Sequence, residues 1–178
     1  IKLNPADFDF EECANRVVDG LLPLLEDKRI NSAVQCEPGS AAVYGDERLV
    51  GRILNNLLSN SIKFTPEGGA ITVDCHATAN GGRLLRVTDT GSGIAAGDID
   101  LVFEKYRQTS AGKSAGGYGL GLAIVKTIAA LHGGTARALS GGLGKGTTVE
   151  ITLPPKPLPG AKPAQPSANT APPPAPRR

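Results

Sequence analysis

The sequence contains no methionine and no tryptophan, and only 4% of its 178 residues are aromatic. The hydrophobic residues, 40% of the total, are therefore mainly Leu, Ile, Val and Ala, which suffice for a packed core. No apolar run approaches the roughly 18–20 residues of a membrane-spanning helix, and the chain does not open with a secretory signal. Because it begins at Ile1 and lacks methionine, we expect it to be part of a longer protein.

Cysteine and histidine are also scarce. The three cysteines, Cys13, Cys36 and Cys75, are odd in number and form no Cys-x-x-Cys pair. This pattern excludes a disulfide framework and a zinc site and favours a reducing compartment. We therefore expect core-filling thiols and a cytoplasmic location for this part of the chain, in a parent protein that could be anchored to a membrane. His76 lies on a predicted strand and His132 at a predicted helix end, where we expect structural roles.

Charge is distributed unevenly along the chain. The whole sequence has 19 basic and 17 acidic residues, but residues 154–178 contain four basic residues and no acidic one. Residues 1–153 are therefore mildly acidic, which argues against a nucleic-acid-binding surface. Ten of the 14 prolines also lie in residues 154–178. We predict that this Pro/Ala-rich tail is disordered, with partner docking through residues 172–176 as an alternative.

Hydrophobic periodicity predicts helices that alternate with strands. Asp9 followed by Glu12 forms a capping box that opens a helix, which we expect to kink at Pro23. Apolar residues recur at helical spacing in residues 46–63 and at every second position in residues 71–76, which is typical of a half-buried strand. The same reasoning predicts one more helix and four more strands, at residues 119–132 and at residues 32–36, 85–89, 135–140 and 147–153.

This order of elements predicts an α+β fold. We expect a two-layer α/β sandwich with a mixed, mostly antiparallel sheet that helices cover on one face. Residues 1–45 would hold a linker with the first helix and strand, residues 46–153 the core of the domain, and residues 154–178 the tail.

The helix predicted over residues 46–63 carries an unusual set of polar residues. Asn56, Asn60 and Lys63 are spaced by four and three positions, which places them on one helix face. A solvated polar face is one interpretation. A binding face is the other, because an amide oxygen can complete the octahedral shell of Mg²⁺ and a lysine can neutralise phosphate oxygens.

Two glycine-rich segments follow in the sequence. Asp89-Thr90-Gly91-Ser92-Gly93-Ile94 comes directly after a predicted strand. Its carboxylate could accept a hydrogen bond from an exocyclic amino group, while its glycines let the backbone approach a flat ring; a tight turn is the simpler interpretation. Gly116-Gly117-Tyr118-Gly119-Leu120-Gly121-Leu122 opens a predicted helix, where free backbone N–H groups favour an anion. This second segment matches neither a Walker A loop nor a Rossmann fingerprint.

In this order and at these separations, the motifs resemble the ATP-binding catalytic domain of sensor histidine kinases. That domain belongs to a wider group with gyrase-type, Hsp90-type and MutL-type ATPases, which share the Bergerat fold. The similarity extends over about residues 1–154. It comprises an N box, a first glycine box, an F box, a second glycine box and a last short motif, at residues 56–66, 89–94, 103–106, 117–122 and 144–147.

The resemblance implies ATP and Mg²⁺ as ligands, and Asn60, Lys63 and Asn56 as the catalytic residues. Asn60 would coordinate Mg²⁺, Asn56 would support the metal and phosphate site, and Lys63 would contact phosphate. Asp89 would bind the adenine amino group. The other residues implied in nucleotide binding are Gly91, Gly93, Ile94, Tyr106, Arg107, Gly117, Tyr118, Gly119, Leu120, Gly121, Leu122 and Thr147, and Ile62 is implied, with Ile94 and Leu122, as a wall of the adenine pocket.

The resemblance also implies a mobile ATP lid at about residues 95–118. Within it Tyr106 would cover the nucleotide, and Lys105, Arg107 and Lys113 are alternatives for a contact with the γ-phosphate. The backbone amides of residues 119–122 would hold the phosphates at the start of the following helix. Residues 1–45 would include the linker from a dimerisation domain.

One position distinguishes the possible reactions. In the gyrase-like branch of the group, a glutamate one helical turn before the metal-binding asparagine activates water, and the corresponding residue here is Asn56, which cannot act as a base. A neutral histidine ring nitrogen needs no such base at pH 7. The resemblance therefore implies transfer of the ATP γ-phosphoryl group to a histidine, for relay to a response-regulator aspartate, rather than hydrolysis.

Neither His76 nor His132 lies in the pattern that carries a phosphoacceptor histidine. We therefore expect the acceptor and its dimerising helices upstream of Ile1, in a full-length kinase that is a homodimer. A response-regulator receiver domain is the other expected partner, and no contact with nucleic acid or membrane is expected of this part. An anti-sigma-type protein serine kinase of the same fold and a non-catalytic docking module are the alternatives.

Overall fold

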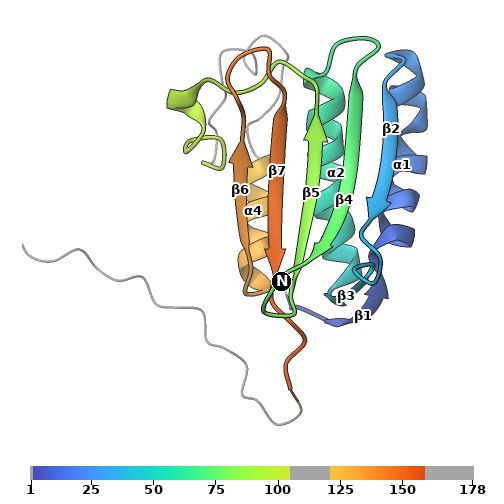
Figure 1. Ribbon diagram of the computed structural model, residues 1–178, viewed down its shortest axis with the longest axis vertical. Coiled ribbons are helices and arrows are strands. Elements are labelled where there is room, and N and C mark those ends of the chain that lie inside the picture. The colour runs from blue at the N-terminus through green and yellow to red at the C-terminus, as the bar shows by residue number, and fades with distance from the viewer. Residues whose placement is uncertain (1, 105–120, 159–178) are drawn as a thin grey trace, which may run out of the picture.

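The computed structural model describes residues 2–104 and 121–158, which are arranged in two layers (Figure 1). The first layer is a five-stranded sheet with the strand order β2-β4-β5-β7-β6. β2 (Asn31–Cys36) runs parallel to β4 (Ala70–Ala77). All the other pairings are antiparallel, and they add β5 (Arg83–Asp89), β7 (Thr147–Leu153) and β6 (Thr135–Leu139). The prediction of a mixed, mostly antiparallel sheet is confirmed.

The second layer contains α1 (Phe10–Asp27), α2 (Glu47–Phe64) and α4 (Gly121–Leu131), which cover one face of the sheet (Figure 1). A short 3-10 turn, η1 (Ala96–Asp98), follows β5. The two-layer α+β arrangement is therefore the predicted one, within the part of the chain that the structure describes.

Aspartate side chains cap α1 and α2, and the cap of α1 is the predicted one. The Asp9 carboxylate accepts a hydrogen bond from the Glu12 N–H at 3.0 Å, which satisfies a free donor in the first turn of α1. Asp46 does the same for α2 through the Leu49 N–H at 3.3 Å. α1 remains helical through Pro23 and ends at Asp27.

Two short strands were not predicted from the periodicity. β1 (Ala6–Asp9) and β3 (Ala42–Gly45) pair in antiparallel register and form a separate small sheet, near the lower ends of β2 and β4 in Figure 1. Most of β1 is exposed, and β3 has only four residues, which is too few for an alternation to be recognised in the sequence. Residues 1–45 therefore contain more regular structure than the linker, helix and strand that we expected.

The hydrophobic core lies between the sheet and the helices. On β4 the buried residues are Ile71, Val73 and Cys75, and on β5 they are Leu85 and Val87 together with the polar Asp89. Every second strand residue thus faces the helical layer, as the period of a pleated strand requires. Asp89 is the last residue of this buried row, at the upper end of β5 in Figure 1.

The cysteines are free thiols that pack in or beside this core. Cys13 and Cys75 are buried and Cys36 is half-buried. Burial raises the pKa of the Cys75 thiol to about 11, so that this side chain is neutral at physiological pH. The expectation of core-filling thiols is confirmed for the two buried residues.

His132 joins the end of α4 to the beginning of α2. Its Nε2 accepts a hydrogen bond from the Asp46 N–H at 2.9 Å, and its Nδ1 lies 2.9 Å from the Ile128 carbonyl oxygen. Because Nε2 is an acceptor and Nδ1 faces a carbonyl, the ring is neutral with its proton on Nδ1. A Cβ at position 45 would lie 3.1 Å from the ring, so Gly45 leaves room for it. The predicted structural role of His132 is confirmed.

The first residues of the proline-rich segment contact the small sheet. Lys156 forms an ion pair with Asp7 of β1, and its Nζ lies 5.4 Å from the centroid of the Tyr44 ring on β3. The rest of the predicted disordered tail, residues 159–178, lies outside the described residues. Among the residues that are described, no helix has the length and apolar character needed to cross a membrane.

Candidate nucleotide-binding site

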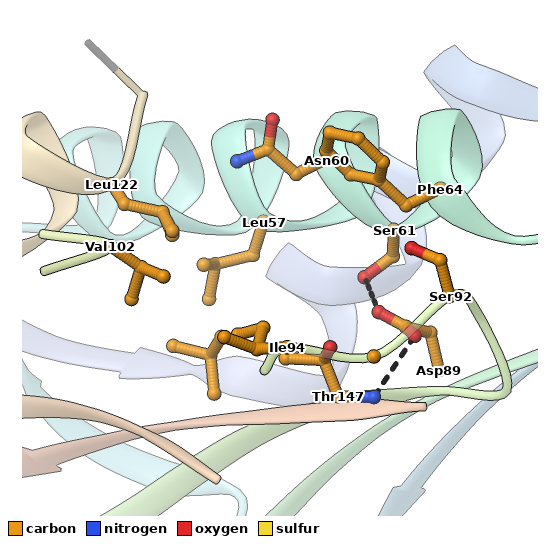
Figure 2. A pocket seen from close by; sticks show the side chains of 12 residues that line it. Leu57, Asn60, Ser61, Phe64, Asp89, Ser92, Ile94, Val102, Leu122 and Thr147 are labelled. Carbon is orange, nitrogen blue, oxygen red and sulfur yellow. Dashed lines mark hydrogen bonds between the residues drawn. The ribbon is translucent and has the colours of Figure 1, made fainter. Parts of the chain in front are cut away.

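A pocket opens between the C-terminal half of α2, the start of α4 and the adjoining ends of β5 and β7 (Figure 2). The residues that line it are Leu57, Asn60, Ser61, Phe64, Asp89, Ser92, Gly93, Ile94, Val102, Leu122, Thr147 and Val149. Figure 2 shows Leu57, Ile94, Val102 and Leu122 grouped on one side, with the carboxylate of Asp89 on the other. An apolar pocket with a few fixed polar groups is suited to a flat, heteroaromatic ligand.

The Asp89 carboxylate is the charged group at the polar end of this pocket. Asp89 is only 9% exposed, and its carboxylate accepts three hydrogen bonds. Oδ1 accepts from the Gly91 N–H at 2.9 Å and from the Thr147 N–H at 3.1 Å. Oδ2 accepts from the Ser61 hydroxyl at 2.9 Å. These bonds compensate for the loss of water around a buried charge and fix the orientation of the carboxylate.

Two glycines of the first glycine box lie too close to neighbouring backbone atoms to carry a side chain. A Cβ on Gly91 would lie 2.7 Å from the Phe64 carbonyl oxygen, at the end of α2. Gly93 has a φ of 67°, and a Cβ there would lie 2.1 Å from the Gly142 carbonyl oxygen. Both contacts are with backbone atoms, which cannot rotate away as a side chain can. Glycine is therefore required at these positions for the loop to reach α2 on one side and the β6–β7 turn on the other.

The last short motif lies directly on the first glycine box. The Gly144 N–H donates to the Ser92 carbonyl at 2.7 Å, and the Gly146 N–H donates to the Gly91 carbonyl at 3.1 Å. Thr147, the next residue, lines the pocket and holds Asp89 through its backbone. Two motifs that are about fifty residues apart in the sequence thus form one wall of the pocket.

The N box meets the start of α4 at the other end of the pocket. A Cβ on Gly121 would lie 3.3 Å from Asn56 Oδ1 and 3.5 Å from Asn60 Nδ2. Both asparagine amides therefore lie next to the first residue of α4, where the helix N-terminus carries a partial positive charge that favours phosphate oxygens. The Asn56 amide nitrogen donates to the Arg52 carbonyl at 2.8 Å, which fixes the side chain in this position.

Lys63 and Ile62 lie differently from the two asparagines. Lys63 does not line the pocket, and its Nζ lies 5.3 Å from the centroid of the Phe64 ring, which does line it. Ile62 is 5% exposed and belongs to the hydrophobic core. The prediction that Ile62 forms a wall of the pocket is therefore wrong, because the helical period turns it toward the sheet, whereas Ile94 and Leu122 do line the pocket.

The asparagine amide oxygens at this end of the pocket are suitable ligands for a magnesium ion that is bound together with a nucleotide. The Asn60 amide can supply one oxygen ligand, with Asn56 beside it. The described residues include no group of three or more His, Cys, Asp or Glu side chains that could hold a metal ion. Mg²⁺ commonly takes one or two protein ligands and completes its shell with phosphate oxygens and water. The residues present therefore fit Mg²⁺ as a partner of a bound triphosphate.

Several expected site residues lie outside the described part of the chain, namely Tyr106, Arg107, Gly117, Tyr118, Gly119 and Leu120, with most of the expected lid. Conversely, sequence reasoning missed lining residues, namely Leu57, Ser61, Phe64, Ser92, Val102 and Val149. Ser61 and Phe64 follow Asn60 and Lys63 directly and could have been found from the N box. Leu57, Val102 and Val149 could not, because aliphatic core residues have the same sequence signal.

Comparison with known proteins places this site in a family. A family model described as "Histidine kinase-, DNA gyrase B-, and HSP90-like ATPase" matches residues 45–157. The chain belongs to this family. Within it, the chain is 39% identical over 146 residues to the histidine protein kinase DivJ of Caulobacter vibrioides, over 79% of this chain and 24% of that protein. It is 30% identical to the adaptive-response sensory kinase SasA of Synechococcus elongatus, over 86% of this chain and 40% of SasA.

Two solved structures have the same fold. Full-length ShkA in complex with AMPPNP superposes with a TM-score of 0.77 at 32% identity, over 86% of this chain and 32% of ShkA. The mycobacterial sensor histidine kinase MprB gives a TM-score of 0.73 at 31% identity, over 88% of this chain and all of that chain. The described fold is thus the ATP-binding domain of a sensor histidine kinase. The chain spans about a quarter of the length of the first curated relatives that it matches.

Proposed function

We propose that this domain binds Mg·ATP and transfers the γ-phosphoryl group to a histidine upstream of the described residues in the same protein, for relay to a response-regulator aspartate. The observation that carries the proposal is the Asp89 carboxylate, buried at one end of an apolar pocket that Asn60 and Leu122 also line. Asn56 does not line the pocket but lies beside Asn60 at the start of α4. Adenosine triphosphate matches this arrangement, because its amino group can face the carboxylate at one end while its phosphates reach the asparagines and the helix start at the other.

The adenine end is supported by hydrogen-bonding chemistry. An ionised carboxylate can only accept hydrogen bonds, and an exocyclic amino group donates them. Ile94 and Leu122 line the same pocket and supply apolar surface against which a flat ring can pack. The carboxylate would favour adenine over a purine that carries an oxo group at the same position, and the apolar walls would supply most of the binding free energy.

The phosphate end is supported by charge. The start of α4 would receive phosphate oxygens, Asn60 would hold Mg²⁺ with Asn56 beside it, and Lys63 would approach phosphate from the last turn of α2. The ion, when bound, neutralises charge on the phosphate oxygens. In the transfer step a neutral imidazole nitrogen of the acceptor forms a bond to the γ-phosphorus, while the bond from that phosphorus to the bridging oxygen breaks and ADP leaves.

Asn56 supports transfer to histidine rather than hydrolysis. Its Nδ2 donates to the Arg52 carbonyl, and an amide cannot remove a proton from water. An imidazole nitrogen has a free electron pair at pH 7 and needs no base. The relatives that are histidine kinases by name are longer than this chain, which agrees with an acceptor domain, a homodimeric full-length kinase and a receiver-domain partner outside the described residues.

The proposal is tested by a nucleotide titration followed by a transfer assay. The chain should bind ATP in a calorimetric titration, and with Mg²⁺ and its upstream histidine domain it should form phosphohistidine from labelled ATP. Asn60→Ala should remove the Mg²⁺-dependent transfer, by about 100-fold or more, because the ion loses its protein ligand. Asn55→Ala is the matched control, since Asn55 is exposed on the same helix.

Two results would contradict the proposal. If the unmodified chain failed to bind ATP, the assignment of the pocket would be wrong. If Asn60→Ala transferred phosphate as fast as Asn55→Ala, Asn60 would not be the metal ligand.

A further inference from the structure

The hydroxyl of Ser61 is part of the Asp89 site. Ser61 lies on α2 next to Asn60, is 6% exposed and lines the pocket. Its Oγ donates a hydrogen bond to Asp89 Oδ2 at 2.9 Å, which Figure 2 shows as a bond across the polar end of the pocket. This is a direct side-chain link between the helical layer and the sheet at the point where a ligand ring would end.

The hydrogen bonds around Asp89 leave little freedom. A carboxylate has about four lone-pair positions. Two on Oδ1 are occupied by the N–H groups of Gly91 and Thr147, and one on Oδ2 is occupied by Ser61. One acceptor position on Oδ2 therefore remains for a ligand. A serine hydroxyl has a single proton, which is already donated here, so Ser61 also presents only lone pairs to the pocket.

We propose that Ser61 is a specificity-determining residue that positions Asp89 and makes this end of the pocket purely accepting. The proposal rests on the function proposed above and adds a selection between two purine classes. A 6-amino purine brings a donor to these acceptors, whereas a 6-oxo purine brings a carbonyl oxygen and leaves lone pairs facing lone pairs. Such mismatches of buried polar groups discriminate strongly between ligands.

Replacement of Ser61 by alanine changes this selection for a physical reason. The space of the hydroxyl opens beside a carboxylate in a solvent-accessible pocket, and a water molecule takes its place. Water has two protons, so it can donate one to Asp89 and the other to a ligand carbonyl. The alanine variant therefore tolerates a 6-oxo purine and loses the fixed orientation that favours the 6-amino purine. Threonine keeps the single-proton hydroxyl and therefore keeps the selection.

The experiment compares ATP with inosine triphosphate, in which an oxygen replaces the amino group. Calorimetric titrations with Mg²⁺ are done on the unmodified chain, Ser61→Ala, Ser61→Thr and the control Ser59→Ala, which removes a hydroxyl from the same helix outside the pocket lining. We expect the ratio of ATP affinity to inosine triphosphate affinity to fall about tenfold or more in Ser61→Ala. The ratio should stay within about threefold of the original in Ser61→Thr and Ser59→Ala.

The outcomes separate this inference from the proposed function and from a merely structural role. A structural tie between α2 and β5 would lower the melting temperature of Ser61→Ala and weaken both nucleotides equally, and an unchanged ratio would overturn the inference. If the threonine methyl group prevents folding, the ratio in Ser61→Ala decides alone. If ATP binds to the unmodified chain and the ratio does not change, only this inference fails, whereas absence of ATP binding to the unmodified chain would refute the proposed function.

Discussion

At the scale of single residues, two aspartates in this domain are buried for different reasons. Asp89 accepts hydrogen bonds at the polar end of the pocket, whereas Asp46 caps α2 at the opposite end of the helix and is 2% exposed. The carboxylate of Asp46 accepts from the N–H groups of Asn4 and Leu49 and from the Arg48 guanidinium. Both carboxylates thus accept several hydrogen bonds, but only Asp89 faces a ligand pocket.

The cap at Asp46 predicts a pH dependence of stability. Burial acts to raise the pKa of Asp46, but the hydrogen bonds from Asn4, Leu49 and Arg48 outweigh it and hold the pKa below its usual value. A lowered pKa in the folded state means that the charged form stabilises the fold above about pH 4, and that this contribution is lost as the pH falls further. We expect the free energy of unfolding to decrease over that range.

The measurement is denaturant unfolding of Asp46→Asn and of the unmodified chain between pH 7 and pH 3. Asp46→Asn keeps a capping side chain but removes the negative charge at the start of α2, so it should cost about 0.5 kcal/mol at pH 7, and the difference should shrink as the pH falls. Asp19→Asn, at an exposed position on α1, is the control. A difference that stays constant over the whole range would show that the charge of Asp46 makes no contribution.

At the scale of elements, the loops at the pocket are fixed by backbone contacts between motifs. The turn between β6 and β7 donates to the carbonyls of Gly91 and Ser92, and the Ile94 N–H donates to the Ser140 hydroxyl at 3.0 Å. The first glycine box is thus held by the β6–β7 turn as well as by its own bond from the Gly91 N–H to the Asp89 carboxylate. Its shape depends on glycine at the points of closest approach.

Gly93 tests this account of the loops. Gly93→Ala would place a methyl group against the Gly142 carbonyl at a backbone φ of 67°, so we expect a loss of about 2 kcal/mol or more in unfolding free energy and weaker ATP binding. Gly97→Ala is the matched control, because a methyl group on Gly97 would meet no atom within 4 Å and the backbone there has no positive φ. Thermal unfolding and an ATP titration of both variants check this; equal behaviour would refute the packing argument.

The elements also show what sequence periodicity can reveal. Long amphipathic segments such as α2 and alternating strands such as β4 were predicted, because one face of each is buried along its whole length. β1 was missed because it is mostly exposed, and β3 because its four residues are too few to establish a period in the sequence. Ile62 was misplaced for a related reason: it is an apolar residue within the N box, and only the helix geometry shows that it belongs to the core.

At the scale of the whole molecule, the topology brings distant motifs to one end of the sheet. α2 and α4 lie together on one face with their directions opposed, as the bond between His132 and the Asp46 backbone shows, so the start of α4 meets the C-terminal half of α2. β5 ends and β7 begins at the same edge. The sequence motifs could be assigned to a family by resemblance. That they line one pocket could be seen only from the strand order and the packing of the helices.

The most direct test of the central claim is the affinity of Asp89→Asn for ATP, measured by calorimetry in the presence of Mg²⁺. The asparagine oxygen can still accept from the Gly91 and Thr147 N–H groups, so the fold should persist as judged by thermal unfolding. The amide nitrogen of the asparagine takes the place of the oxygen that faces the ligand. We predict a loss of ATP affinity of at least about tenfold, because a donor would then face the adenine amino group. Asp74→Asn, on the outer face of the neighbouring strand β4, should bind ATP normally. An Asp89→Asn variant that is folded and binds ATP as well as Asp74→Asn would contradict the assignment of this pocket to adenine.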